Sequence, residues 1–125
     1  MTQLSVIIPI YNEEGNIPFL FERLKGAISK LNISCEYIFV NDGSVDNSLS
    51  LIKQLNTQNS EVKYIDFSRN FGHQIAVTAG LDHCSGQAVV IIDADLQDPP
   101  ELVPELIERF RNGADVVHTT RTQRD

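Results

Sequence analysis

The sequence predicts an α/β protein of three layers, αβα, in which a mainly parallel β-sheet lies between helices. Short apolar runs alternate along the chain with longer segments in which apolar residues recur every three or four positions. This alternation is typical of βαβ units. Hydrophobic residues make up 42% of the 125 residues, which is enough apolar material for the core of one domain. We therefore expect a single compact domain.

Five short apolar runs are the candidate strands of the sheet. Longer segments with helical periodicity separate them, so we expect crossover helices to join consecutive strands and the strands to run parallel. The runs cover Leu4–Ile10, Tyr37–Val40, Val62–Phe67, Ala88–Ile92 and Val116–Thr119.

The first two helices are predicted from apolar stripes with i, i+3, i+4 spacing. Ser and Asp side chains accept hydrogen bonds from the free N–H groups of a helix start. The second helix is therefore expected to begin near Asp46, with Asp46 or Ser44 as its N-cap. The inward residues are predicted to be Ile17, Leu20, Phe21, Leu24, Ile28 and Leu31 in the first helix, and Leu49, Ile52 and Leu55 in the second.

Two further helices are expected after the third and fourth apolar runs. The third lies near Gly72–Cys84, where small and apolar residues allow close contact with the sheet. The fourth follows Asp98, which suits an N-cap. Because Pro104 lacks an amide donor, we expect either an irregular first turn or a start nearer Val103. The inward residues are predicted to be Ile75, Ala76, Ala79 and Gly80 in the third helix, and Leu102, Leu106, Ile107 and Phe110 in the fourth.

The charge and the cysteine content exclude several classes of protein. Ten Lys and Arg residues stand against 17 Asp and Glu residues, and the net charge of -7 lacks the basic character that nucleic-acid binding requires. An anionic ligand would therefore need a metal ion between itself and this chain. Cys35 and Cys84 lie in apolar or helical patterns, so we expect reduced packing thiols in a reducing compartment.

The chain shows no targeting signal. The first ten residues lack a basic segment and their apolar run is too short for a secretory signal, while no later run approaches the ~20 apolar residues of a membrane span. We therefore expect a cytoplasmic location. Residues 119–125 follow the last candidate strand without a closing helix, so we expect the chain to be the truncated N-terminal part of a longer protein.

Three polar side chains, Asp93, Asp95 and Gln97, follow the fourth apolar run. Ligands of an open α/β sheet bind beyond the carboxyl ends of its strands. In an extended chain, residues i and i+2 point to the same face, about 6–7 Å apart at Cα, and two acids placed so repel each other unless a cation lies between them. Mg²⁺ takes one or two protein carboxylates and completes its shell with water and substrate phosphates. A cation site is predicted, with Ala94 leaving room for a ligand; capping of the next turn is the structural alternative.

Two other strand ends carry polar residues and fall on the same edge of a parallel sheet. After the first run, Pro9 fixes the exit direction, Tyr11 can stack on a base and Glu13 can bind ribose hydroxyls. Asp42 ends the second run, where a carboxylate can accept hydrogen bonds from a base imide or a ribose hydroxyl; an Asx-turn before the helix is the alternative. The three strand ends are expected to converge on one crevice.

Further candidates follow the third and fifth runs. Gly72 indicates a backbone conformation or a close approach that a side chain would block. Asn70 either orients a ligand or ties the loop down, and His73 is interpreted as a helix-start residue rather than a base. Arg121 and Arg124 follow the last strand at the same edge, where they either meet a second anion or are simply exposed.

Together these motifs resemble family 2 glycosyltransferases with a GT-A nucleotide-sugar-binding domain. More narrowly, they resemble the dolichyl-phosphate mannose synthase-like and bacterial polyprenyl-phosphate glycosyltransferases. The resemblance covers almost the whole chain and rests on the order and spacing of the motifs rather than on any one of them. The motifs are Val6-Ile-Ile-Pro-Ile-Tyr-Asn-Glu-Glu14, Val40-Asn-Asp-Gly-Ser-Val-Asp46, Ser68-Arg-Asn-Phe-Gly-His73 and Asp93-Ala-Asp-Leu-Gln-Asp-Pro-Pro-Glu101.

The resemblance implies that residues 1–125 are the nucleotide-sugar-binding part of a GT-A domain, from which acceptor and membrane regions are absent. It implies transfer of a sugar, with inversion, from a UDP- or GDP-sugar to a polyprenyl phosphate at the cytoplasmic face of a membrane, with Mg²⁺ or Mn²⁺ as cofactor. The implied nucleotide-sugar ligands are Pro9, Tyr11, Asn12, Glu13, Asp42, Gly72, Asp93, Ala94 and Asp95. The implied metal ligands are Asp93, Asp95 and Gln97, the catalytic residues Asp95 and Arg121, and the acceptor-phosphate ligands Arg121 and Arg124.

Three alternatives stay open from the sequence. A family 2 enzyme acting on a glycan or polysaccharide hydroxyl would need a carboxylate base from beyond residue 125, and the Asp-Leu-Gln-Asp-Pro-Pro-Glu run favours the phosphate acceptor. A Mg²⁺-binding receiver-like signalling domain also gathers acids at strand ends, but it requires a lysine where this sequence has arginine. A nucleotide-binding module without catalytic turnover is the third.

Overall fold

The computed structural model describes residues 2–95, 101, 103–105, 107 and 116–118. Strands and helices alternate strictly from the first strand to the fourth. The elements are β1 (Leu4–Ile10), α1 (Ile17–Ser29), β2 (Cys35–Asn41), α2 (Ser48–Gln58), β3 (Val62–Asp66), α3 (His73–His83), β4 (Ala88–Ile91) and β5 (Val116–His118).

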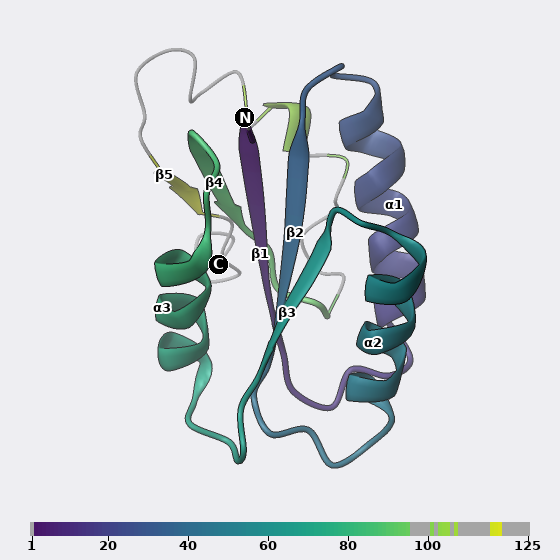
Figure 1. Cartoon of the computed structure of the whole chain (residues 1–125), viewed down its shortest axis with the longest axis vertical. Helices are drawn as coiled ribbons and strands as arrows, with labels where there is room; N and C mark the ends of the chain where they lie inside the picture. Colours follow the sequence, from purple (N-terminus) through teal and green to yellow (C-terminus); the bar gives the residue numbers. More distant parts are fainter. Residues whose placement is uncertain (1, 96–100, 102, 106, 108–115, 119–125) are drawn as a thin grey trace, which may run out of the picture.

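The strands form one parallel sheet of five strands in the order β3-β2-β1-β4-β5. Helices α1 and α2 lie on one side of this sheet and α3 lies on the other, which confirms the three-layer αβα arrangement (Figure 1). The chain adds β2 and β3 on one side of β1 and then returns to place β4 on its other side. The order of the sheet therefore reverses between β1 and β4, and this reversal is where ligands bind in open α/β sheets.

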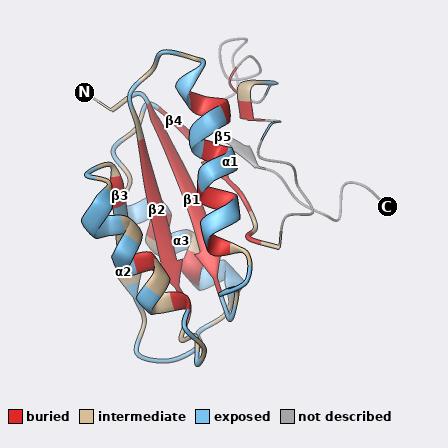
Figure 2. Cartoon of the chain, turned by 90° about the vertical axis from the view of Figure 1, so that its right-hand side faces the viewer, coloured by how far each residue is buried: buried red, intermediate tan, exposed pale blue. Residues whose placement is uncertain are grey.

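Successive residues of each strand supply the two faces of the sheet. In β1, Leu4, Val6 and Ile8 belong to the large core cluster that also contains the inward residues of α1. Ile7 belongs to a second, smaller cluster with Ala76 of α3. The central strands are buried throughout (Figure 2). This period of two decides which polar residues at the strand ends face α3.

Helix α1 buries the predicted stripe. Five of its apolar residues and Ala27 are buried, and Leu31, predicted to be the last residue of the stripe, lies beyond the helix end but still packs against the same core. The five are Ile17, Leu20, Phe21, Leu24 and Ile28.

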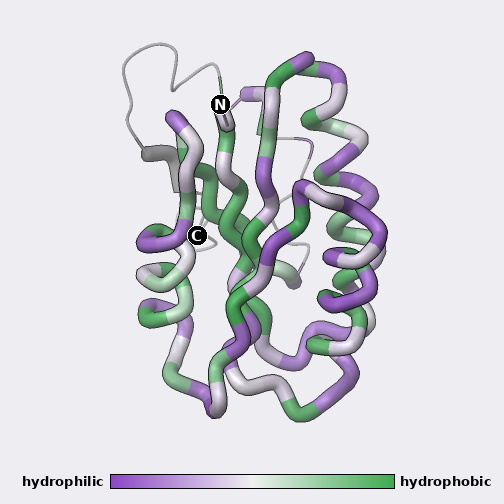
Figure 3. The backbone as a smooth tube through the Cα atoms, in the orientation of Figure 1, coloured by the Kyte–Doolittle hydropathy of each residue, from purple (hydrophilic) through white to green (hydrophobic). Residues whose placement is uncertain are grey.

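Helix α2 begins at Ser48, and its N-cap is Asn47, so the prediction of Asp46 or Ser44 as the N-cap is wrong. Asp46 still contacts the start of the helix. The Asp46 Oδ1 atom accepts a hydrogen bond of 2.9 Å from the backbone N–H of Ser48. Leu51, rather than the predicted Leu49, packs against the core beside Ile52 and Leu55. Figure 3, in the orientation of Figure 1, shows hydrophobic and hydrophilic residues interspersed along α2, as expected of a helix with one face on the core.

Helix α3 contacts the sheet through small residues. Ala76 and Gly80 are buried, and a Cβ atom at Gly80 would lie 2.5 Å from Ile7 Cγ2, so glycine is required for this close packing. The prediction that Ile75 faces inward is wrong, because its side chain is 51% exposed. A stripe of small residues has no strong apolar periodicity, and this weakens the sequence signal for its inward face.

The fourth predicted helix is described only in part. Residues 103–105 and 107 are helical, and Val103 and Ile107 pack into the large core cluster. The cap Asp98 and the remaining predicted inward residues, Leu102, Leu106 and Phe110, lie outside the described residues. Among the residues that the structure describes, no helix is long and apolar enough to cross a membrane.

A buried carboxylate joins several elements at the opposite end of the sheet from the strand carboxyl termini. Glu36 of β2 accepts hydrogen bonds from Ser5 of β1, from Lys63 of β3 and from Ser85 after α3. Burial opposes ionisation of Glu36, but these donors outweigh it and lower its pKa to about 2. Cys35 beside it is a free thiol, as predicted, and burial raises its pKa to about 12.

Candidate active site

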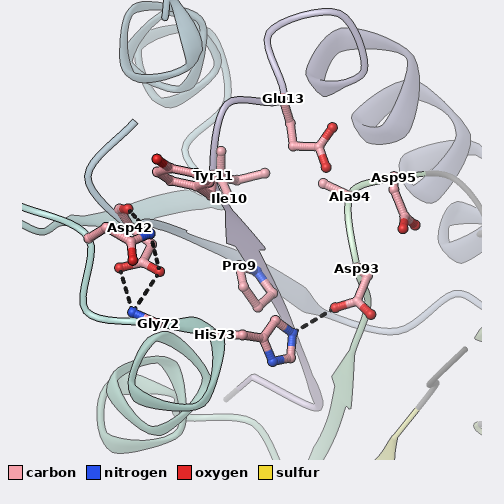
Figure 4. A pocket seen from close by; sticks show the side chains of 11 residues that line it. Pro9, Ile10, Tyr11, Glu13, Asp42, Gly72, His73, Asp93, Ala94 and Asp95 are labelled. Carbon is pink, nitrogen blue, oxygen red and sulfur yellow. Dashed lines mark hydrogen bonds and ion pairs between the residues drawn. The ribbon is translucent and has the colours of Figure 1, made fainter. Parts of the chain in front are cut away.

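A cavity of about 560 Å³ opens at the carboxyl ends of β1, β2 and β4. Its size is in the range of small-molecule and cofactor sites, and it lies at the point where the strand order reverses. The lining residues are Pro9, Ile10, Tyr11, Glu13, Asp42, Asn70, Gly72, His73, Asp93, Ala94 and Asp95. The predicted convergence of three strand ends is therefore what the structure shows (Figure 4).

Three of these residues share the face of the sheet that α3 covers. The core cluster on that face contains Ile7, Val40 and Ile91, one residue from each of the three strands. Side chains two residues apart in a strand point to the same face. The cavity residues that lie two positions further along are therefore directed to this face as well, and they are Pro9, Asp42 and Asp93. The N-terminus of α3 then approaches all three strand ends (Figure 4). The cavity is thus formed by strand alternation together with one crossover helix.

Pro9 lies where the ladder between β1 and β4 stops. The carbonyl of Ile7 accepts a bond from the N–H of Ile92, whereas the carbonyl of Ile10 accepts one from Asp42 on the other side. Alternation therefore directs the backbone of Pro9 toward β4, and proline has no N–H to donate there. Strands β1 and β4 separate beyond this point, which opens the cavity between them.

Asp42 is buried at the end of β2, with 3% of its surface exposed. Its carboxylate accepts hydrogen bonds from the backbone N–H groups of Phe71 (2.7 Å) and Gly72 (3.1 Å) and from Asn70 Nδ2 (3.2 Å). The same amide of Asn70 donates to the carbonyl of Asp42. Asp42 therefore fixes the loop before α3 rather than forming the Asx-turn considered from the sequence, and of the two readings of Asn70 the structure shows the one that ties this loop down.

Two glycines allow the loops to meet. Gly43 has φ +72°, and a Cβ atom there would lie 2.3 Å from the backbone of Arg69 and Asn70. Gly72 has φ +106° with open space around it, so the predicted requirement for glycine comes from backbone conformation and not from crowding. Both positions place the loop before α3 across the end of β2.

The loop after β1 is fastened to the loop after β2. Asn12, in the left-handed region at φ 54°, donates its N–H to Ser44 Oγ and accepts a bond from the N–H of Val45. The N–H of Glu13 donates to Ser48 Oγ over 2.9 Å. The Glu13 carboxylate accepts a bond from Asn16 and lines the cavity, and the half-exposed Tyr11 stands beside it. The structure thus gives Asn12 a role in holding the loop, while Tyr11 and Glu13 face the ligand space.

Asp93 and Asp95 both line the cavity, although β4 ends earlier than predicted. The strand stops at Ile91, and residues 94 and 95 form a turn, so the expectation of an extended chain through both acids is wrong. The turn still keeps both carboxylates at one rim of the cavity (Figure 4). Ala94 between them is buried in the core and leaves that rim open.

His73 is the site residue whose role the sequence did not indicate. It begins α3, as expected, but its Nε2 atom also lies 2.8 Å from Asp93 Oδ1. The two residues are 20 positions apart. Only the order of the elements could have indicated this contact, because the start of α3 and the end of β4 lie at the same edge of a parallel sheet.

The two carboxylates fit a hard divalent cation. Mg²⁺ and Mn²⁺ prefer oxygen ligands, and Mg²⁺ needs only one or two protein carboxylates when substrate phosphates complete its shell. Within the described part of the chain, no cluster of three or more His, Cys, Asp or Glu residues could hold a metal ion by itself. Two carboxylates suit a cation whose remaining positions are filled by water and a phosphate-bearing ligand. Gln97, Arg121 and Arg124 lie outside the described residues, so their predicted roles stay predictions.

The parallel sheet and the cavity at the reversal of its strand order define an α/β domain that binds its ligand at the carboxyl ends of the strands. The family model described as "Glycosyl transferase family 2" matches residues 5–125. The chain belongs to this family, as the resemblance in its motifs predicted. A receiver-like signalling domain does not agree with this membership.

Curated relatives of high similarity are bacterial and phage proteins. An uncharacterized glycosyltransferase of Bacillus subtilis, YkcC, is 50% identical over 122 residues, which cover 98% of this chain and 38% of that protein. A bactoprenol glucosyl transferase of Shigella phage SfV is 42% identical over 122 residues, covering 98% of this chain and 40% of that protein. The chain thus spans about two fifths of the length of these relatives.

Solved structures agree on the fold. TarS 1-349 of S. aureus in complex with UDP-GlcNAc superposes with a TM-score of 0.69 at 22% identity, covering 89% of this chain and 31% of that one. The mannosyltransferase PcManGT of Pyrobaculum calidifontis in complex with GDP-Man and Mn²⁺ gives a TM-score of 0.66 at 24% identity, covering 85% of this chain and 31% of that one. At these identities the comparison supports the GT-A fold itself.

Proposed function

We propose that this chain is the donor-binding part of a glycosyltransferase that transfers a sugar, with inversion, from a UDP- or GDP-sugar to a polyprenyl phosphate. The observation that carries this proposal is the convergence of Pro9, Asp42 and the Asp93–Asp95 turn on one cavity at the reversal of strand order. Two structural neighbours bind UDP-GlcNAc and GDP-Man with the same fold, which supports a nucleotide-sugar donor.

The nucleoside half of the donor is assigned to the β1–β2 side of the cavity. The Tyr11 ring is half exposed and offers a stacking surface, and Glu13 presents a carboxylate that can accept hydrogen bonds from ribose hydroxyls. Asp42 and Gly72 form the wall between them and α3. Because Asp42 uses its oxygens to hold backbone N–H groups, its main contribution is to keep this wall in place.

The diphosphate half is assigned to the β1–β4 side, next to Asp93 and Asp95. These two carboxylates, with Gln97 as the predicted third ligand, would hold Mg²⁺ or Mn²⁺. When bound, the ion neutralises charge on the diphosphate and stabilises the nucleoside diphosphate as a leaving group. Asp93 and Asp95 orient that half of the donor, and the buried Ala94 between them leaves the cavity rim open.

The transfer step needs no strong protein base. An oxygen of the acceptor phosphate attacks the anomeric carbon from the face opposite the diphosphate, a new C–O bond forms, and the bond to the diphosphate breaks, so the configuration inverts. A phosphate monoester has a second pKa near 6, so at neutral pH its oxygen is already ionised. Arg121 and Arg124 are the residues we assign to the acceptor phosphate.

The relatives support the proposed acceptor class. A bactoprenol glucosyl transferase is among the curated proteins that this chain matches over almost its whole length. A polyprenyl phosphate acceptor would require a longer form of the protein to associate with a membrane. The transfer would take place at the cytoplasmic face of that membrane, because nucleotide sugars are available on that side.

The proposed transfer is tested by incubating the chain, and any longer form of the protein that contains it, with radiolabelled UDP- or GDP-sugars. Vesicles carrying a polyprenyl phosphate and a soluble glycan are offered as competing acceptors. We expect Mn²⁺- or Mg²⁺-dependent label in the lipid fraction. Label found only in the glycan would instead support the alternative family 2 reaction on a hydroxyl.

A further inference from the structure

We propose that His73 is a positioning residue for Asp93, and that its imidazole sets the direction in which this carboxylate meets the cation. The inference rests on the proposed function, because it assumes a cation between Asp93 and a donor diphosphate. It goes beyond that function in adding a residue outside the assigned metal ligands. Neither the helix-start reading of His73 nor the acidic pair at the end of β4 predicts this contact.

The contact itself is short. The Nε2 atom of His73 lies 2.8 Å from Oδ1 of Asp93. An ionised carboxylate has only acceptor atoms, so the imidazole nitrogen must carry the hydrogen that is shared. Both the neutral Nε2–H tautomer and the imidazolium ion can donate in this way, so the positioning role holds for either charge of His73.

The hydrogen bond leaves Asp93 able to bind a cation. A carboxylate offers about four lone-pair positions on two oxygens, and one donor occupies one of them. The Asp93 side chain is 21% exposed and lines the cavity, so its other positions face the ligand space. Figure 4 shows the imidazole on the α3 side of Asp93, away from Asp95 on the opposite side. The cation site between the two acids is therefore not obstructed by His73.

The backbone of His73 is itself firmly placed. Gly72, at φ +106°, turns the chain into α3, and its N–H is held by Asp42. The carbonyl of Gly72 accepts the N–H of Ala76 over 3.1 Å, which closes the first turn of the helix. Ala76 and Gly80 then hold α3 against the sheet. The imidazole thus extends from a fixed point, as an orienting donor must.

Asp93 needs such a donor because it follows a strand that has already ended. Residues 92 and 93 lie beyond Ile91, the last residue of β4. The Asp93 side chain, which lies outside the strand, can rotate away from the cation position. The hydrogen bond to His73 restricts this rotation, so the Asp93 side chain loses less conformational entropy when a cation binds. Loss of outer partners of this kind costs about 10–100-fold in metal affinity.

The test compares four variants with the wild-type chain. His73→Phe keeps a planar ring but removes the donor, His73→Ala removes the ring as well, and His73→Gln keeps a donor at similar reach. His83→Phe is the matched control, because His83 is an exposed residue at the other end of α3 whose ring contacts the carbonyl of Ala79. Circular dichroism and the thermal midpoint establish that each variant is folded.

Two affinities are measured by calorimetry, that of Mn²⁺ for the chain saturated with UDP or GDP, and that of the nucleotide without Mn²⁺. For His73→Phe and His73→Ala we expect Mn²⁺ affinity to fall about 10–100-fold, with metal-free nucleotide affinity within about twofold of wild type. His73→Gln should recover most of the loss, and His83→Phe should bind as wild type does. The electron paramagnetic resonance spectrum of bound Mn²⁺ should change in the same two variants that lose affinity.

Wild-type Mn²⁺ affinity in His73→Phe and His73→Ala would overturn the inference while leaving the proposed function intact. An equal loss of metal-free nucleotide affinity would also overturn it, because His73 would then contact the nucleotide directly. Failure of the wild-type chain to bind Mn²⁺ with either nucleotide would contradict the proposed function, and this inference with it.

Discussion

The carboxylate of Asp42, at the end of β2, holds the backbone N–H of Gly72, just before α3, at 3.1 Å from Oδ2 and 3.4 Å from Oδ1. Through this contact one strand end fixes the start of the helix that reaches Asp93 at another strand end. The cavity wall formed by Asp42 and Gly72 therefore depends on the Asp42 carboxylate, and Asp42 is almost fully buried.

Removing that carboxylate should weaken both the fold and the site. Asp42→Ala leaves the N–H groups of Phe71 and Gly72 without their acceptor in a part-buried position. We expect a loss of about 1–3 kcal/mol in the free energy of unfolding, measured by urea denaturation, together with weaker nucleotide binding. Asp82→Ala, at an exposed position on α3, is the control and should leave both unchanged. Unaltered stability in Asp42→Ala would show that this loop is held by other contacts.

Two glycine substitutions should change stability in opposite directions. Gly43→Ala places a Cβ atom 2.3 Å from the backbone of Arg69 and Asn70 at φ +72°, and we expect a loss of about 2–5 kcal/mol. Gly26→Ala, inside α1 with open space around it, should gain about 0.5–1 kcal/mol through helix propensity. Equilibrium denaturation of the pair measures both effects. Equal changes in the two variants would contradict the proposed difference in backbone constraint.

Glu36 should make stability depend on pH in acid. Its pKa is about 2 in the folded chain against 4.5 when unperturbed, so its contribution is complete above pH 4.5 and is lost as the pH falls from there toward 2. The full contribution is up to about 3 kcal/mol by linkage. Denaturation midpoints between pH 2 and pH 6 should therefore fall more steeply for wild type than for Glu36→Gln. The exposed Glu22→Gln serves as the charge-matched control, and a Glu36→Gln curve parallel to it and to wild type would refute the assignment.

The fold was largely predictable because strand and helix periods are local signals. The predicted first strand, Leu4–Ile10, coincides with β1. The second strand begins two residues before the predicted Tyr37, because Cys35 and Glu36 pair with β1 and the polarity of Glu36 concealed that pairing. The buried Glu36 carboxylate is stabilised inside the sheet by hydrogen bonds from Ser5, Lys63 and Ser85. These partners are distant in the sequence, so no local pattern predicts them.

The location of the site could be predicted from the sequence, but the hydrogen bonds that connect its residues could not. Parallel strands place their carboxyl ends on one edge, so the meeting of Asp42, Asp93 and the loop after β1 follows from the order of elements. The hydrogen bonds from residues 70–72 to Asp42 and from His73 to Asp93 span 28 to 30 and 20 positions of sequence. Such contacts depend on how α3 packs against the sheet, and single-sequence patterns do not encode that packing.

The central claim is that the cavity binds a nucleoside diphosphate together with a divalent cation held by Asp93 and Asp95. Titration of the chain with UDP and with GDP, each with and without Mn²⁺, tests it most directly. We expect one nucleotide to bind, with affinity at least about tenfold higher when Mn²⁺ is present, and we expect Asp93→Asn and Asp95→Asn to lose that increase while Asp82→Asn keeps it. No binding of either nucleotide by the folded chain, or an increase that survives both substitutions, would contradict the account.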